Sequence, residues 1–169
     1  MNEVKGRVLW LDRDIKPFML YHVLRLRYEG YEIFEFGIRK MIQALECLIE
    51  KDNLDLIIVE PSFPLSVKEE EFFERLRSEY PEILPVPEHQ HAKGSILIHA
   101  AAVIRPDVPV LVFSICSKGD ISDIPRMLEG LERLSNVVEV SSKIDLADTA
   151  FFVQKVGQVI EGSRQKEKK

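Results

Sequence analysis

Acidic side chains follow two apolar, strand-length segments of the sequence. Asp12 and Asp14 come directly after the first apolar segment, and Glu60 follows residues 54–59 (LDLIIV). Carboxylates in such places can bind a hard divalent cation, which prefers oxygen ligands, or can attack a phosphoryl group as a nucleophile. Arg13 lies between the two aspartates and brings a permanent positive charge to the same turn.

The histidines offer a second kind of chemistry. His89 and His91 stand one residue apart beside Glu88, and alternate residues of an extended segment could face one metal ion. The same stretch is polar and follows several prolines, and we favour its interpretation as a solvated loop. His22 and His99 lie within helical patterns, where we expect packed or surface side chains and no metal ligands.

The segments around these residues alternate between strand and helix patterns. This order predicts βαβ units with right-handed crossovers, and so a doubly wound, five-stranded parallel sheet. In such sheets ligands bind at the carboxyl ends of the strands, where the acidic residues lie. The expected strands are residues 7–11, 31–36, 54–59, 109–115 and 137–140, and the expected helices are 14–30, 39–51, 66–80, 94–104, 125–134 and 146–160.

Length and composition favour one domain. The 169 residues are 46% hydrophobic, which suits a single core over residues 1–162 followed by a polar, frayed tail at 163–169. Residues 65–93 look like an insertion between the third strand and the next regular helix. A capping-box pattern at Ser66 opens this insertion, and its apolar stripe is expected to pack on the domain, the alternative being a docking site for another protein.

Charge and composition narrow the function classes. The net charge of -5 and the lack of a long basic run disfavour nucleic-acid binding. The start of the chain lacks a signal-peptide pattern and no apolar run could cross a bilayer, so we expect a cytoplasmic protein. Cys47 and Cys116 lack the paired spacing of a zinc site and are expected to be reduced thiols. Without a Walker loop, dinucleotide fingerprint or nucleophile elbow, we expect neither enzyme activity nor a cofactor.

The sequence resembles the receiver domains of response regulators, the CheY-like proteins of two-component and phosphorelay signal transduction. These have a flavodoxin-like fold, and the resemblance covers the chain except for the insertion. The segments that carry it are residues 8–14 (VLWLDRD), 30–32 (GYE) and 56–64 (LIIVEPSFP), together with Ser114 and Lys143 at the ends of the fourth and fifth strands.

The resemblance also shows where this chain departs from the family. Glu60 stands at the position of the phosphoacceptor aspartate, and Arg13 stands at a position where the family has a metal-binding acid. Ile144 replaces the proline that follows the family's lysine. These changes imply a degenerate phosphoacceptor site, or pseudo-receiver, formed by Glu60, Asp12, Arg13, Ser114 and Lys143.

An internal ion pair could replace the metal in such a site. We hypothesise that the guanidinium of Arg13 joins the carboxylates of Glu60 and Asp12, with Lys143 as a further candidate member. The alternative is that Arg13 points into solvent, while Asp14 caps the following helix. For Ser114 and Lys143, the alternative is an ordinary turn residue at a strand end.

The resemblance implies a signalling protein that acts through protein contacts and is not phosphorylated. Its partners would be a sensor kinase or a downstream signalling protein, and a homodimer could form through residues 125–134, 137–140 and 146–160. One alternative is a competent phosphoacceptor that binds magnesium through Asp12 and Asp14. Another is a flavodoxin-like small-ligand or enzyme domain that recruits His89 and His91.

Overall fold

A five-stranded parallel sheet forms the centre of the molecule. The computed structural model describes residues 4–12, 19–37, 40–61, 65–83, 95–114, 136–143 and 146–166. The sheet has the order β2-β1-β3-β4-β5, and every neighbouring pair of strands is parallel. This confirms the predicted doubly wound α/β fold. The strands are β1 (Gly6–Leu11), β2 (Tyr31–Phe36), β3 (Leu56–Val59), β4 (Val110–Ser114) and β5 (Val137–Ser142).

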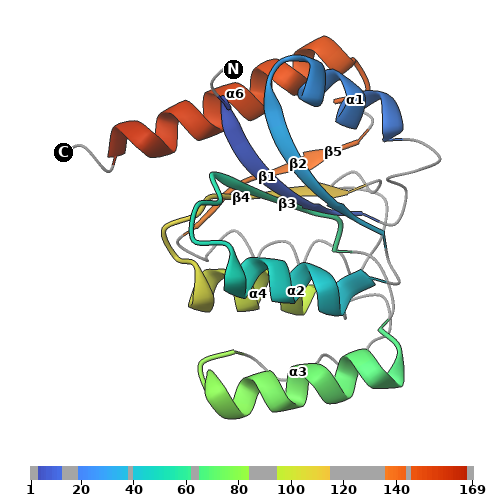
Figure 1. Cartoon of the computed structure of the whole chain (residues 1–169), viewed down its shortest axis with the longest axis vertical. Helices are drawn as coiled ribbons and strands as arrows, with labels where there is room; N and C mark the ends of the chain where they lie inside the picture. The colour runs from blue at the N-terminus through green and yellow to red at the C-terminus, as the bar shows by residue number, and fades with distance from the viewer. Residues whose placement is uncertain are drawn as a thin grey trace.

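Helices cover both faces of this sheet (Figure 1). α1 (Leu20–Tyr28) and α6 (Thr149–Lys166) lie on one face, and α2 (Met41–Glu50) and α4 (Ser95–Ile104) lie on the other. Successive strand residues point to opposite faces, so each strand contributes to two cores. Trp10 and Phe113 pack on the α1 and α6 side, whereas Leu9, Leu11 and Val112 pack on the α2 and α4 side.

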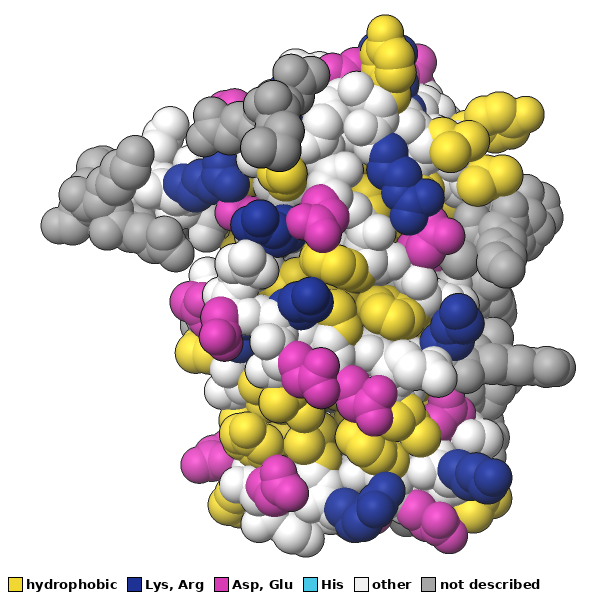
Figure 2. All heavy atoms as spheres, viewed as in Figure 1, with side chains coloured by type: hydrophobic (Ala, Val, Ile, Leu, Met, Phe, Trp, Pro, Cys, Tyr) yellow, Lys and Arg dark blue, Asp and Glu magenta, His cyan; other side chains and the backbone are white. Residues whose placement is uncertain are grey.

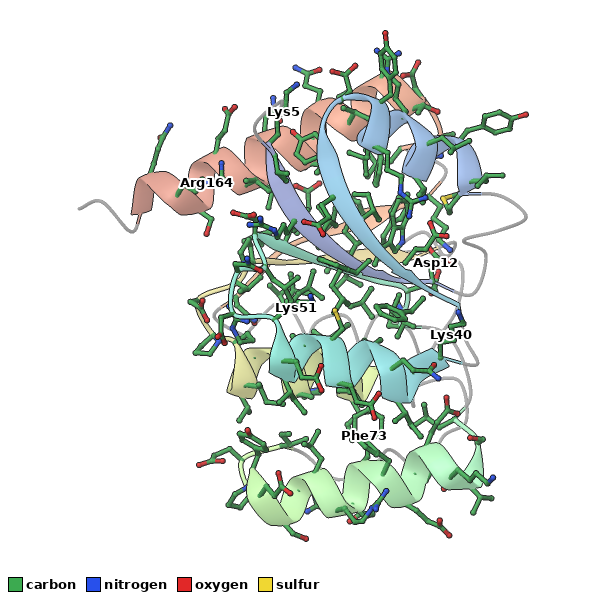
Figure 3. The ribbon with its side chains drawn as sticks, in the orientation of Figure 1. Lys5, Asp12, Lys40, Lys51, Phe73 and Arg164 are labelled. Carbon is green, nitrogen blue, oxygen red and sulfur yellow. The ribbon has the colours of Figure 1, made fainter. Side chains whose placement is uncertain are left out.

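α3 (Val67–Glu79) lies outside the layer that α2 and α4 form (Figure 1). Its predicted capping box is present: the Ser66 hydroxyl accepts from the Glu69 backbone, and the Glu69 carboxylate accepts from the Ser66 backbone at 2.7 Å. Phe73 is fully buried and points from α3 toward α2 (Figure 3), and Leu76 belongs to the same core. The apolar stripe of α3 therefore packs on this domain, as predicted.

The structure corrects the predicted beginning of the first helix. α1 begins at Leu20 with Met19 as its N-cap, and Met19 makes no side-chain capping bond. The sequence had suggested a helix start at Asp14, because an aspartate followed by a proline in the first turn is typical of an N-cap. Asp14 lies outside the described residues. The C-terminal end agrees with the prediction, since Gly30 adopts a φ of 97° that favours glycine.

The last helix is also shifted from its predicted bounds. α6 begins at Thr149, where the Asp148 carboxylate accepts from the backbone of Ala150 and Phe151 at 2.8 and 2.9 Å. It continues to Lys166, so the prediction of a frayed tail is wrong for residues 163–166. Arg164 pairs with Asp55 at 2.7 Å, which ties this last turn to the segment before β3.

One predicted helix cannot be compared with the structure. The helix predicted over residues 125–134 lies outside the described residues.

Among the helices that the structure does describe, none combines the length and the apolar character needed to cross a membrane.

Substituting Phe73→Ala should show that α3 is part of the cooperative fold. Removing a fully buried phenylalanine ring commonly costs about 3 to 5 kcal/mol, because a cavity remains. Val67→Ala on the same helix is the control, since Val67 is 71% exposed and its loss should change stability by no more than roughly 0.5 kcal/mol. Urea unfolding followed by circular dichroism would measure both, and equal small effects would mean that α3 does not belong to the core.

Candidate functional site

Three ionisable side chains meet at the carboxyl end of the sheet. Asp12 follows β1, Glu60 follows β3 and Lys143 follows β5. Sheet-like backbone bonds continue one residue beyond β1 and β3, because the Asp12 amide donates to the Phe36 carbonyl at 3.0 Å and the Glu60 amide donates to the Leu11 carbonyl at 2.9 Å. These bonds fix the points from which both carboxylates leave the backbone. Figure 3 shows Asp12 at this end of the sheet, away from Arg164.

A buried ammonium group joins the two carboxylates. Lys143 Nζ lies 2.7 Å from Asp12 Oδ1 and 3.1 Å from Glu60 Oε2. Asp12 and Glu60 are fully buried, and Lys143 is 6% exposed. A buried charge is tolerated only when paired and hydrogen-bonded, so these three side chains depend on one another. We call them the Asp12–Lys143–Glu60 cluster.

Aromatic rings line the inner side of the cluster. Trp10 Nε1 lies 3.4 Å from Asp12 Oδ2 and donates a long hydrogen bond to it, so both oxygens of this carboxylate face donors. Lys143 Nζ lies 5.9 Å from the centre of the Phe113 ring, within the range of a cation–π contact. Trp10 and Phe113 are both fully buried. The polar cluster is thus continuous with the aromatic core on the α1 and α6 side.

The electrostatics of Lys143 are set by two opposed effects. Burial of the ammonium lowers the pKa of Lys143, because the charged form loses its hydration. The negative charges and hydrogen bonds of Asp12 and Glu60 act the other way and prevail, so the net effect is a raised pKa. Lys143 is therefore a firmly held cation.

A histidine bonds to the backbone of Leu146, close to Lys143 in the sequence. His22 on α1 donates from Nε2 to the backbone carbonyl of Leu146 at 3.1 Å, and its ring packs edge-on against Phe152 at 5.0 Å between centroids. Leu146 lies three residues after Lys143 on the way to α6. His22 is 5% exposed, as expected for a packed histidine, but its bond to this connection was not predicted.

The predicted site residues fall into two groups. The structure brings Asp12, Glu60 and Lys143 together. Ser114 ends β4 beside Ser142 of β5 in backbone register, but its side chain is not described. Arg13, Asp14, His89 and His91 lie outside the described residues, and within the described part of the chain no group of three or more His, Cys, Asp or Glu side chains could hold a metal ion.

Sequence reasoning missed the role of Trp10. The signal was present, because side chains two residues apart on a strand point to the same face, and Trp10 stands two residues before Asp12. A buried indole also needs an acceptor for its N–H group. Nothing in the sequence marked the bond from His22 to Leu146, whose partners are 124 residues apart.

Comparison with solved structures shows a CheY-like fold. A CheY-like response regulator receiver domain protein from Methanospirillum hungatei JF-1 is similar with a TM-score of 0.64 and 12% identity, over 97% of this chain and 99% of that chain. A signal receiver domain of an HD domain-containing protein from Pseudomonas fluorescens Pf-5 is similar with a TM-score of 0.61 and 14% identity. The match covers 95% of this chain and 98% of that chain. An adenylate cyclase structure from Rhodopirellula baltica is similar with a TM-score of 0.54 and 17% identity. The match covers 97% of this chain and 98% of that chain.

No protein-family model and no curated protein sequence matches the chain. At these low identities the likeness to solved structures is one of fold. It agrees with the strand order β2-β1-β3-β4-β5 and places the Asp12–Lys143–Glu60 cluster where this fold holds its ligand sites.

Replacing Lys143 by methionine should destabilise the protein strongly. The substitution leaves two buried carboxylates without their shared ammonium, and breaking a buried pair in this way costs about 3 to 5 kcal/mol. Lys155→Met is the matched control, because the Lys155 ion pair with Glu139 is partly exposed and such pairs contribute roughly 0 to 1 kcal/mol. Urea unfolding at neutral pH would measure the difference. Equal losses in the two variants would contradict a tightly coupled cluster.

The stability difference between the parent and Lys143→Met should depend on alkaline pH. The pKa of Lys143 is raised in the fold, so the folded state retains this proton more strongly than the unfolded chain. The contribution is fully present below the unfolded pKa, near 10.4, and declines as the pH rises through the higher folded value. We expect a constant difference in the free energy of unfolding between pH 7 and about 10 and a smaller one above. A difference that grows with alkaline pH would contradict the assignment.

Proposed function

We propose that this chain is a receiver-like signalling protein that acts by binding protein partners and does not accept phosphate at Glu60. The observation that carries the proposal is the state of the Glu60 carboxylate, which is fully buried and lies 3.1 Å from the ammonium of Lys143. The CheY-like fold supports a signalling role, since this fold most often serves as a non-catalytic signalling module.

Phosphoryl transfer to a carboxylate requires an oxygen that can approach the donor in line. Glu60 has no exposed surface, and its oxygen faces a cation that withdraws electron density from it. Glutamate is also one methylene longer than the aspartate it replaces, so its oxygens lie further from the backbone of β3. The burial of Glu60 and its pairing with the ammonium of Lys143 oppose nucleophilic attack.

Arg13 is the second part of the proposal. It directly follows Asp12, so its guanidinium leaves the chain one residue from the Asp12–Lys143–Glu60 cluster. A permanent cation there would repel a magnesium ion and would supply the positive charge that the ion otherwise brings. The cluster would then be held by basic side chains in place of a metal, and no cofactor is part of the proposed function.

Partner binding is proposed by analogy with the fold. A sensor kinase or a downstream signalling protein is the partner class that receiver domains serve. The homodimer face suggested by the resemblance includes β5, an edge strand whose Val138 is 44% exposed, and the adjoining surface of α6. The third part of that face, residues 125–134, lies outside the described residues.

Treating the protein with acetyl phosphate and magnesium should leave its intact mass unchanged. The buried Glu60 carboxylate is expected not to react, because neither its access nor its charge environment suits attack. Mass spectrometry measures the result directly. A gain of one phosphoryl group that maps to Glu60 or Asp12 would overturn the proposal in favour of a magnesium-dependent phosphoacceptor.

The double variant Arg13→Asp with Glu60→Asp serves as the matched comparison. It restores the acidic pattern of the family and should bind magnesium more tightly than the parent, as measured by titration calorimetry. Equal magnesium binding by parent and variant would contradict the idea that Arg13 replaces the metal.

A further inference from the structure

The outward face of α1 is apolar. Four of its side chains are largely exposed to solvent: Leu20 (44%), Tyr21 (77%), Leu24 (49%) and Tyr28 (81%). We call these four residues the outer stripe. Figure 2 shows apolar side chains standing out of the surface at the place that α1 occupies in Figure 1.

The outer stripe is opposite to the buried side of the same helix. His22, Val23 and Leu26 face the core. Leu20, Leu24 and Tyr28 follow one another at a spacing of one turn on the other side. A helix at the surface normally presents polar residues to water, and a helix that is apolar on both sides is normally covered on both. Single exposed apolar residues are common, but these four lie on one face of one short helix, and such clustering marks interaction sites.

We infer that the outer stripe binds the outer stripe of a second copy of this chain. This inference goes beyond the proposed function and does not depend on the chemistry of the Asp12–Lys143–Glu60 cluster. Its first support is charge. The basic residues that flank the stripe already have acidic partners within the same molecule, at 2.7 Å for Arg25 with Glu29 and 3.3 Å for Arg27 with Glu35.

Among the described residues, the rim of the stripe is therefore balanced in charge. A second copy would meet no like-charge repulsion there, although each molecule carries a net charge of -5. A strongly acidic partner, such as a nucleic acid, would have to compete with Glu29 and Glu35 for these arginines. Charge thus favours a partner with the same balanced rim, which a copy of the chain provides.

The second support is the symmetry of the residue pattern. Leu24 lies midway between Leu20 and Tyr28 along the helix. An antiparallel pairing of two α1 helices about a two-fold axis at Leu24 brings Leu20 of each copy opposite Tyr28 of the other. The contact is then the same patch on both molecules, as a two-fold interface requires.

The third support is area. An aromatic side chain removes about 150 to 250 Å² from water on burial, so the two tyrosines, about four-fifths exposed, would bring roughly 300 Å². The half-exposed leucines raise the stripe to roughly 500 Å² per copy. Two copies would together bury roughly 1,000 Å², which is about the area that a specific interface must reach.

Sedimentation equilibrium of the full chain across micromolar concentrations tests this inference. We expect the parent to approach twice the monomer mass and Leu24→Glu to remain a monomer, because two glutamates would meet at the two-fold axis. Ile49→Glu is the matched control, since Ile49 is 38% exposed on α2, on the opposite face of the sheet from α1, and this variant should remain a dimer. A monomeric parent at about 100 μM, well above the micromolar Kd of even a weak specific pair, would overturn the inference.

A second variant separates loss of contact from loss of fold. Tyr21→Ser with Tyr28→Ser removes most of the exposed area without adding charge, and it should weaken dimerisation at least tenfold while circular dichroism and melting stay close to the parent. A dimer that persists in this variant or in Leu24→Glu, or one that is lost equally in Ile49→Glu, would also overturn the inference. None of these outcomes changes with phosphorylation of Glu60, so the two proposals can fail separately.

Discussion

The buried ammonium of Lys143 is the interaction on which the arrangement of the site depends. Lys143 follows β5, at the edge of the sheet, yet its Nζ reaches carboxylates that follow β1 and β3. The side chain must therefore extend across the end of β4, which requires all four strands to be in register. Asp12 and Glu60 could be buried without this cation only at a large desolvation cost. The cluster can therefore form only when these strands of the sheet are correctly assembled.

The aromatic core explains why this cluster is held so closely. Trp10, Phe113 and Phe152 pack with ring centroids 5.1 to 6.1 Å apart directly beneath it. Rings on this side exclude water and lower the local dielectric, which strengthens each ionic contact and raises the cost of losing one. Trp10 takes part in both layers, because its ring belongs to the core and its N–H group donates to Asp12. Packing and electrostatics therefore support each other at the same residues.

The parts of the fold that the sequence predicted are those with a strong local signal. β3 is a fully buried apolar run, and α3 opens with a capping box, so both were recognised. The errors fall at helix ends. Asp14 and Pro17 have the chemistry of a helix start, but α1 begins at Leu20, where no capping side chain marks it.

The end of α6 was missed for a different reason. Residues 163–166 are polar and have no apolar stripe, and a long-range pair between Arg164 and Asp55 supports them. Pairs formed between distant parts of the chain leave no local pattern. The same limit applies to the site. The rule for strand ends predicted the positions of Asp12 and Glu60, whereas only the family resemblance predicted a role for Lys143. Neither source predicted the bond from His22 to Leu146.

The two sides of α1 make different kinds of contact. Its inner side carries His22, which donates to the Leu146 carbonyl, and its outer side carries the outer stripe. A rigid helix transmits a small shift along its whole length, because its backbone bonds and packed side chains resist bending. A partner that moved α1 would act on His22, whose ring packs on Phe152, and Phe152 in turn packs on Trp10, which donates to Asp12. Contacts among described residues therefore lead from the outer stripe to the Asp12–Lys143–Glu60 cluster.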